Sequence, residues 1–251
     1  MSHLILLGTS NAIPNPDHEN THMALVTNGG VILIDCVGSP SVRLSKAGIE
    51  LSSISDLILT HFHPDHVAGV PLLLMNMWLE GREEPLRIYG LHHCLERIED
   101  VMALYHWDKW PGFFPVAFHR LPEREYISVL ETEEVKIYSS PVRHLIPTIG
   151  LRFEDAQGSG VIAYSCDTEP CPSMVRLARK VDVLIHEATG FGAGHSSASQ
   201  AGSIAREAGA NKLILIHYPI VDLDPGNLLE QVSTTFDGEV EIAEDFMQIP
   251  L

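Results

Sequence analysis

The segment "HFHPDH" brings four metal-capable side chains within six residues: His61, His63, Asp65 and His66. It follows the apolar run "DLILT", which predicts a strand, so His61 and His63 point to one side and the intervening phenylalanine to the other. Pro64 then turns the chain, and Asp65 and His66 begin a predicted helix. Imidazole nitrogens and carboxylate oxygens are the usual ligands of zinc and related metals. The segment therefore predicts a metal site.

Three further candidate ligands lie later in the chain: His144 in "SSPVRHLIP", Asp167 in "YSCDTEP" and His217 in "LIHYP". Four ligands from the first segment alone would close a structural site around a single ion. Seven ligands suit two ions better, because Asp167 and a water molecule can be shared between them. Two such ions lower the pKa of the shared water toward neutrality and stabilise the attacking and leaving oxygens, so the default chemistry is hydrolysis.

The elements that position these residues follow from apolar periodicity. We expect strands at 3–7, 23–27, 31–35, 56–60, 86–90, 134–139, 148–153, 161–165, 182–186 and 213–217, and helices at 40–47, 66–80, 93–105, 172–180, 198–209 and 225–235. The two halves of the chain have similar patterns, which predicts a duplicated sandwich of α/β class. A length of 251 residues favours one domain, residues 1–251.

The polar candidates share one location relative to these elements. His61, Asp167, the pair His186-Glu187 and His217 each stand at or just after the carboxyl end of a predicted strand. Ligands of α/β sheets bind at that edge, because loops converge where the strands end. The placement therefore favours one shared site over scattered core histidines.

Charge and composition limit the partners. The chain has 33 acidic and 16 basic residues, a net charge of −17, and no basic cluster. Long nucleic acids are therefore disfavoured as substrates. No stretch predicts a signal peptide or a membrane span. The four cysteines lack zinc-ribbon or CxxC spacing, so we expect reduced thiols in a cytoplasmic protein.

The ordered motifs "HFHPDH", a later single histidine, "SCDT" and "LIHYP" resemble those of the metallo-β-lactamase fold superfamily over essentially the whole chain. The resemblance implies a four-layer αβ/βα sandwich of α/β class. It also implies two zinc ions, with Asp35 of "VILIDC" supporting the HxHxDH loop. One ion would be held by His61, His63 and His144, the other by Asp65, His66 and His217, with Asp167 bridging them. The ligand types also admit manganese or iron, although His63 stands where the di-iron branch has an acidic residue, which argues against redox chemistry.

The segment "HEATGFGAGHSSASQAG" resembles the ribonuclease Z branch of this fold, whose members cut phosphodiesters. The resemblance implies that His195 either donates to a non-bridging phosphate oxygen or protonates the leaving alcohol, and that Glu187 fixes and charges His195. Asp65, beyond its role as a ligand, is a candidate base or orienting group for the water. The alternative is structural: His195 would only cap the helix region 198–209, and Glu187 would only be a carboxylate at the end of a strand.

The chain departs from that branch in one respect. Only 22 residues lie between His144 and Asp167, and "EDAQGSG" predicts a tight acidic hairpin there. The long basic arm that grips transfer RNA in ribonuclease Z is therefore absent. We expect a phosphodiesterase for small or nucleotide phosphodiesters. Two alternatives stay open: transfer-RNA 3′-processing, and a lactonase or thioester hydrolase, which shares the seven ligands without needing His195 and Glu187.

A last segment, residues 105–120, contains six aromatic residues in "YHWDKWPGFFPVAFHR". Its broken pattern predicts satellite core or a homodimer contact, or alternatively a lid that stacks on the substrate. We interpret the remaining histidines as surface or hydrogen-bonded residues: His3, His18, His22, His92, His93, His106, His119 and His186.

Overall fold

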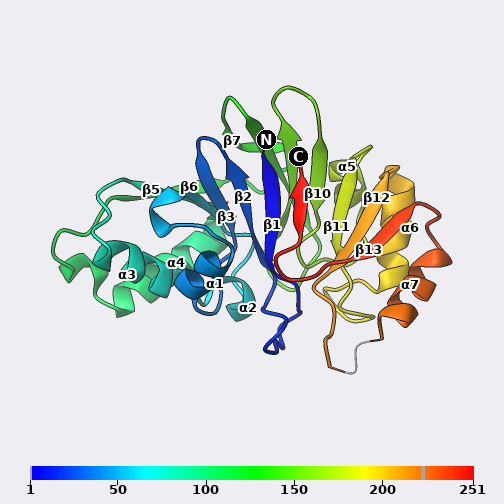
Figure 1. The fold of residues 1–251 in the computed structure, drawn as a ribbon, viewed down its shortest axis with the longest axis horizontal. Helices are drawn as coiled ribbons and strands as arrows, with labels where there is room; N and C mark the ends of the chain where they lie inside the picture. The colour runs from blue at the N-terminus through cyan, green and yellow to red at the C-terminus, as the bar shows by residue number, and fades with distance from the viewer. Residues whose placement is uncertain (1, 222–223) are drawn as a thin grey trace.

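Two seven-stranded sheets pack against each other in the centre of the computed structural model, which describes residues 2–221 and 224–251 (Figure 1). The first sheet has the order β14 (Gln248–Pro250), β1 (His3–Gly8), β2 (His22–Thr27), β3 (Gly30–Ile34), β4 (Ile54–Ile58), β5 (Leu86–Leu91), β6 (Val116–Leu121). The second has the order β13 (Glu239–Ile242), β12 (Lys212–Ile216), β11 (Val183–Glu187), β10 (Val161–Tyr164), β9 (Thr148–Asp155), β8 (Val135–Val142), β7 (Ile127–Glu131).

Both sheets repeat the same sequence of strand directions. In the first sheet the pairs from β14 to β3 are antiparallel and those from β3 to β6 are parallel. In the second sheet the pairs from β7 to β10 are antiparallel and those from β10 to β13 are parallel. The two halves therefore build the same seven-strand unit, as the duplicated sequence pattern predicts.

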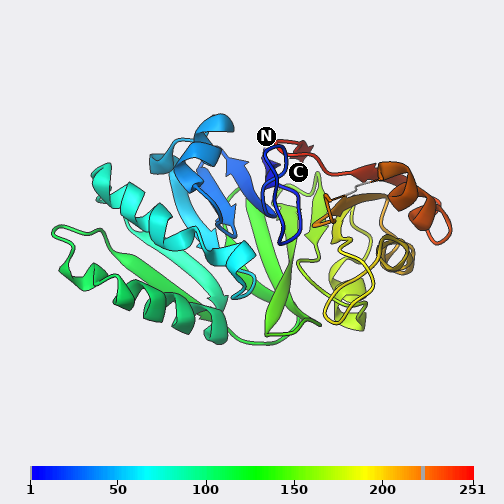
Figure 2. The ribbon, with the colours of Figure 1, turned by 90° about the horizontal axis from the view of Figure 1, so that it is seen from below.

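Helices cover the outer face of each sheet (Figure 2). The first sheet carries α1 (Pro40–Lys46), α3 (Val70–Leu79) and α4 (His92–Leu104), and the second carries α5 (Pro172–Leu177), α6 (Ala198–Ala208) and α7 (Pro225–Ser233). Strand β1 shows why such a sheet needs cover on both sides. Leu4 and Leu6 pack into the core between the sheets, whereas Ile5 and Leu7 pack into the core under the helices. The predicted four-layer αβ/βα sandwich is confirmed.

The sequence prediction misses four strands, namely β6, β7, β13 and β14. They are the outermost strands of the two sheets. An edge strand has a neighbour on one side only and is often short or charged, so its apolar signal is weak. Strand β13, for example, reads "EVEI" and alternates between exposed and half-buried positions.

The aromatic segment 105–120 packs partly on the core. Phe114 is buried, and Trp107, Trp110, Phe113 and Phe118 pack on the cluster beneath the first sheet's helices. Trp110 also stacks on Trp78 of α3. The satellite-core interpretation is therefore correct for these side chains, whereas Tyr105 is exposed.

The loops that follow β3, β4, β10, β11 and β12 gather with the short helix α2 (Pro64–Val67) at one edge of the sandwich, the lower edge in Figure 1. The four cysteines are free and buried. Within the described chain the longest helix, α4, has 13 residues, and no helix is long and apolar enough to cross a membrane.

Candidate metal centre

The seven predicted ligand residues converge at this edge in two groups that share one aspartate. The first group is His61, His63, His144 and Asp167, and the second is Asp65, His66, His217 and Asp167. In each group, one potential ligand atom per residue lies within 4.8 Å of all the others. The loops after β4, β8, β10 and β12 supply these residues, so both sheets contribute.

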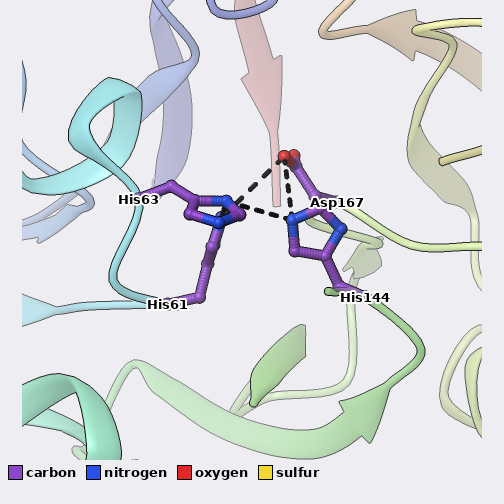
Figure 3. Close-up of side chains that lie close together, drawn as sticks. All are labelled: His61, His63, His144 and Asp167. Atoms are coloured by element: carbon purple, nitrogen blue, oxygen red, sulfur yellow. Dashed lines mark hydrogen bonds and ion pairs between the residues drawn. The ribbon is translucent and has the colours of Figure 1, made fainter. Parts of the chain in front are cut away.

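The first group surrounds a small space lined by three imidazoles (Figure 3). His63 Nδ1 lies 3.0 Å from His61 Nε2 and 3.1 Å from His144 Nε2. Asp167 closes the group, with Oδ2 3.8 Å from His61 Nε2 and 3.9 Å from His144 Nε2. The four side chains point toward one another from both sides of the interface between the sheets.

The second group uses the other oxygen of the same aspartate. Asp167 Oδ1 lies 3.5 Å from the Nε2 atoms of His66 and His217. Asp65 Oδ2 lies 3.7 Å from His66 Nε2 and 3.6 Å from His217 Nε2. One carboxylate thus presents one oxygen to each group, which is the arrangement a bridging ligand requires.

The donor set fits a pair of divalent ions. Ligand atoms about 2.1 Å from one tetrahedral ion lie roughly 3.4 Å from each other, close to the separations in both groups. Three buried atoms, His66 Nε2, His217 Nε2 and Asp167 Oδ1, have no hydrogen bond within the described chain. An unsatisfied buried polar atom costs about 1–3 kcal/mol. A cation at their meeting point would satisfy all three.

Hydrogen bonds behind the imidazoles fix which nitrogen faces the centre. The Thr189 hydroxyl donates to the His217 carbonyl (2.8 Å), so it accepts from His217 Nδ1, also at 2.8 Å. His144 Nδ1 donates to the Gly194 carbonyl at 2.7 Å. Because Nδ1 holds the proton in both rings, the Nε2 lone pair is directed into the site.

Asp35 orients two further histidines from one position. Its carboxylate accepts from His66 Nδ1 (2.8 Å), the Thr60 amide (2.8 Å) and the Thr60 hydroxyl (2.7 Å). The Thr60 hydroxyl has given its proton to Asp35, so it accepts from His61 Nδ1, 3.1 Å away. The predicted support of the HxHxDH loop by Asp35 is therefore confirmed at the level of contacts.

Burial and charge set the protonation of the site. Burial lowers the pKa of His61 well below its usual value, and lowers that of His63 and His144, so these rings are neutral, as metal ligands must be. Burial alone would lower the pKa of His66, but Asp167 and Asp35 raise it well above its usual value. Burial would likewise raise the pKa of Asp167, but His217 and His66 hold it well below its usual range.

Strained backbone lies next to three of the strands that end at the site. Asp35 (φ 58°), Cys166 (φ 52°) and His217 (φ 53°) adopt left-handed conformations although none is glycine. Such residues cost about 1–3 kcal/mol each and are concentrated at functional sites. Here the sharp turns follow β3, β10 and β12 and direct Asp35, Asp167 and His217 inward.

Glu187 and His195 lie directly beside both groups. Glu187 is fully buried, and its Oε1 accepts from His195 Nδ1 at 3.0 Å and from the amides of Thr168 and Ser196. Burial alone would lower the pKa of His195, but its bond to Glu187 raises it. The His195 ring stacks on His217 and meets the His144 ring edge-on.

The alternative, in which His195 serves only to cap helix α6, does not account for the position of its ring. Helix α6 begins with a capping box in which the Ser197 side chain accepts from the Gln200 amide. The helix therefore has its cap without His195, whose half-buried ring faces the histidines of the two groups instead.

Sequence reasoning missed Glu169 and Gly194. Glu169 Oε1 accepts from the Gly194 amide at 2.8 Å, and the Gly194 carbonyl holds His144. Gly194 has φ +82°, and a Cβ there would lie 2.8 Å from His144 Nδ1. The signal that could have found it is the glycine directly before His195, at a position that needs a left-handed backbone.

We expect Gly194→Ala to weaken zinc affinity by about 10–100-fold, the usual effect of disturbing a group that orients a ligand. The added methyl would displace His144 from the first group. Competition with a fluorescent chelator measures the change. Gly192→Ala is the matched control, because a Cβ at Gly192, in the same loop, meets nothing within 4 Å. Equal zinc affinity in both variants would contradict the assignment.

Two mixed sheets flanked by helices, with the histidine and aspartate cluster at their common edge, define a metallo-β-lactamase fold. The chain belongs to the beta-lactamase superfamily: the model of the beta-lactamase superfamily domain matches residues 31–218. Hydrolases of this fold use divalent metals, and the His/Asp cluster is suited to bind them.

Three known proteins illustrate the relationship. Ribonuclease Z of Methanothermobacter thermautotrophicus is 28% identical, over 99% of this chain and 96% of its own length. The structure of human tRNase Z, short form, aligns with a TM-score of 0.75 and 26% identity over 100% of both chains. The metallo-β-lactamase fold protein YhfI from Bacillus subtilis aligns with a TM-score of 0.83 and 22% identity over 98% of both chains. The predicted resemblance to this superfamily and to ribonuclease Z is confirmed.

Proposed function

We propose that this protein is a phosphodiesterase that uses two divalent ions, with zinc as the first choice, to hydrolyse small or nucleotide phosphodiesters. The observation that carries the proposal is the division of seven ligands into two groups around the two oxygens of Asp167, with the Glu187–His195 pair alongside. Relatives named ribonuclease Z support the choice of a phosphodiester over other substrates.

In this proposal the first ion is held by His61, His63 and His144 and the second by Asp65, His66 and His217, with Asp167 shared. When bound, such a pair supplies Lewis acidity and lowers the pKa of a coordinated water toward neutrality. The chain's own contribution is to hold four of the five imidazoles in fixed tautomers, through Asp35 and Thr60 for His66 and His61, Thr189 for His217 and Gly194 for His144.

Asp65 would orient the attacking water. Burial would raise the pKa of Asp65, but His217 and His66 lower it below its usual value. A carboxylate with a lowered pKa is a weak base, so orientation by its second oxygen suits it better than removal of a proton.

His195 would act on the phosphate. Its Nδ1 is committed to Glu187, and its raised pKa keeps the ring cationic to a higher pH. The remaining nitrogen can donate to a non-bridging oxygen or to the leaving alcohol, both of which gain negative charge during hydrolysis. The fixed, buried Glu187 stabilises the charge on the ring.

A small substrate is favoured by the shape of the second sheet. Strands β9 and β10 form a tight hairpin, closed by a hydrogen bond from the Asp155 amide to the Gly160 carbonyl (2.9 Å). The predicted hairpin is confirmed, and it occupies the stretch in which ribonuclease Z was expected to carry its arm. The short hairpin and the net charge of −17 together argue against binding of long nucleic acids.

A hydrolysis panel on metal-loaded protein tests the proposal. It should contain phosphomonoesters, linear and cyclic phosphodiesters, lactones and a thioester, with metal content measured on the same sample. We expect turnover of diesters that chelation abolishes and added zinc or manganese restores. Turnover of lactones or thioesters without diesters would replace the proposal by the carboxyl-ester alternative.

Precursor transfer RNA is expected to be cleaved weakly or not at all. The second candidate, transfer-RNA 3′-processing, is favoured only by the relatives' names. Cleavage assays at increasing salt, with an active ribonuclease Z as positive control, decide between the two. Efficient cleavage at physiological salt with a steep inverse salt dependence would overturn the small-substrate proposal.

A further inference from the structure

Exposed apolar side chains are concentrated in the loops around the metal centre. Of the ten large apolar side chains that are exposed within the described chain, four lie in those loops: Ile13, Leu145, Phe191 and Val221. We call these four residues the apolar rim. Single exposed apolar residues are ordinary on a protein surface. Their placement beside the ligands, on a chain of net charge −17, is the feature to be explained.

Each rim residue is tied to the site through its own loop. Leu145 directly follows His144, and Val221 lies four residues after His217. Ile13 belongs to the loop anchored there by the hydrogen bond from the Asn11 amide to the Tyr218 carbonyl (3.2 Å). Phe191, 81% exposed, directly precedes a turn closed by the hydrogen bond from the His195 amide to the Gly192 carbonyl (3.3 Å).

Leu145 directly follows His144, and Phe191 lies four residues before His195, the group that would meet the phosphate. A Cβ built on Gly194 would lie 3.0 Å from Leu145 Cγ, so Leu145 packs against the loop that carries Phe191 and His195. A cavity of about 580 Å³ opens beside His144. The apolar side chains of Leu145, Ile146 and Pro147 line one part of it, and charged side chains line another. It has room for a ring attached to a phosphate held at the centre.

Three of the four charged side chains that line this cavity, Glu125, Arg143 and Arg176, have a partner of opposite charge. Arg176 pairs with Glu125 through two hydrogen bonds of 2.8 and 2.7 Å. Glu169 is held by the Gly194 amide, with the Arg143 guanidinium 3.9 Å away. A neutral substituent therefore meets paired charges there, apart from Glu123, which also lines the cavity.

Given the proposed phosphodiesterase function, on which this inference rests, we propose that the apolar rim selects phosphodiesters with an aromatic substituent, such as an aryl group or a nucleobase. Leu145 and Phe191 hold the ring while the metal centre and His195 hold the phosphate. An aromatic ring against these side chains gains apolar burial and, at Phe191, stacking. A methyl substituent gains neither.

Binding of two phosphonates tests this without turnover. Phenylphosphonate and methylphosphonate share the head group, so the ratio of their dissociation constants on zinc-loaded protein reports the substituent alone. We expect phenylphosphonate to bind about tenfold more tightly in calorimetric titrations. Phe191→Ser and Leu145→Ser should each lower that ratio about three- to tenfold, with methylphosphonate binding changed less than twofold. Leu104→Ser is the matched control, because Leu104 is 80% exposed but lies at the end of α4.

Equal dissociation constants for the two phosphonates would refute the proposed role of the apolar rim. The phosphodiesterase proposal would be unaffected. Preference for the phenyl group that survives both serine variants would also refute the role of the apolar rim, since other residues would then hold the ring. If the protein binds phenylphosphonate more tightly than methylphosphonate and yet hydrolyses no diester, this result would support the apolar rim as an aromatic subsite and refute the proposed reaction. Failure of both ligands to bind at millimolar concentration would refute the two together.

Discussion

Asp167→Asn is expected to reduce bound metal from two equivalents to one or fewer and to lower diester turnover by about 10³-fold or more. Asp167 presents one oxygen to each ligand group, 3.5–3.9 Å from four imidazole nitrogens. Asparagine keeps the shape but removes the negative charge and one of the two oxygens, so it cannot bridge two cations. A loss of this size is typical when a principal electrostatic group is removed from an active site.

Metal analysis and thermal unfolding check this result independently of activity. Added zinc should raise the unfolding temperature of the parent protein, because an ion that binds only the folded state stabilises it. In Asp167→Asn, added zinc should raise the unfolding temperature by a smaller amount. Asp155→Asn, in the turn between β9 and β10, is the control and should behave like the parent. Two full equivalents of metal in Asp167→Asn would show that the ions do not share this residue.

The convergence of the candidate ligands could be predicted from the sequence because each of them belongs to a short motif that begins where an apolar strand ends. His61, Asp167 and His217 follow β4, β10 and β12 within three residues. Parallel neighbours in a sheet end at the same edge, so strand ends far apart in sequence meet in space. The duplicated order of directions then brings the edges of both sheets together.

Two residues that position His144, Gly194 and Glu169, could not be predicted in the same way, unlike Asp35. Gly194 acts through its backbone carbonyl and amide, and Glu169 acts through that amide. Backbone contacts of this kind leave no side-chain pattern, apart from the positive φ that favours glycine. The four outer strands were missed for a related reason, because their pairing depends on a neighbour supplied by the tertiary fold rather than on their own periodicity.

His195→Ala is expected to lower turnover of diesters with a poor leaving alcohol by about 10²–10⁴-fold while leaving metal content intact. His195 lies outside the two ligand groups that share Asp167, and its ring packs on His144 and His217. If His195 protonates the leaving alcohol, diesters that release a stabilised aryloxide need little protonation. Their turnover should then fall much less. If His195 holds a non-bridging oxygen, both kinds of substrate should lose activity about equally.

Glu187→Gln separates the charge of His195 from its presence. The bond to Glu187 raises the pKa of His195, so the ring stays cationic to a higher pH in the parent protein. Glutamine removes that charge and lowers the pKa, so the alkaline limb of the pH–rate profile should move to lower pH, with a smaller loss at its optimum than in His195→Ala. The limb should be absent in His195→Ala. If His195→Ala hydrolyses every diester at the parental rate, the segment before α6 serves only the fold, and the carboxyl-ester alternative becomes the better account of the site.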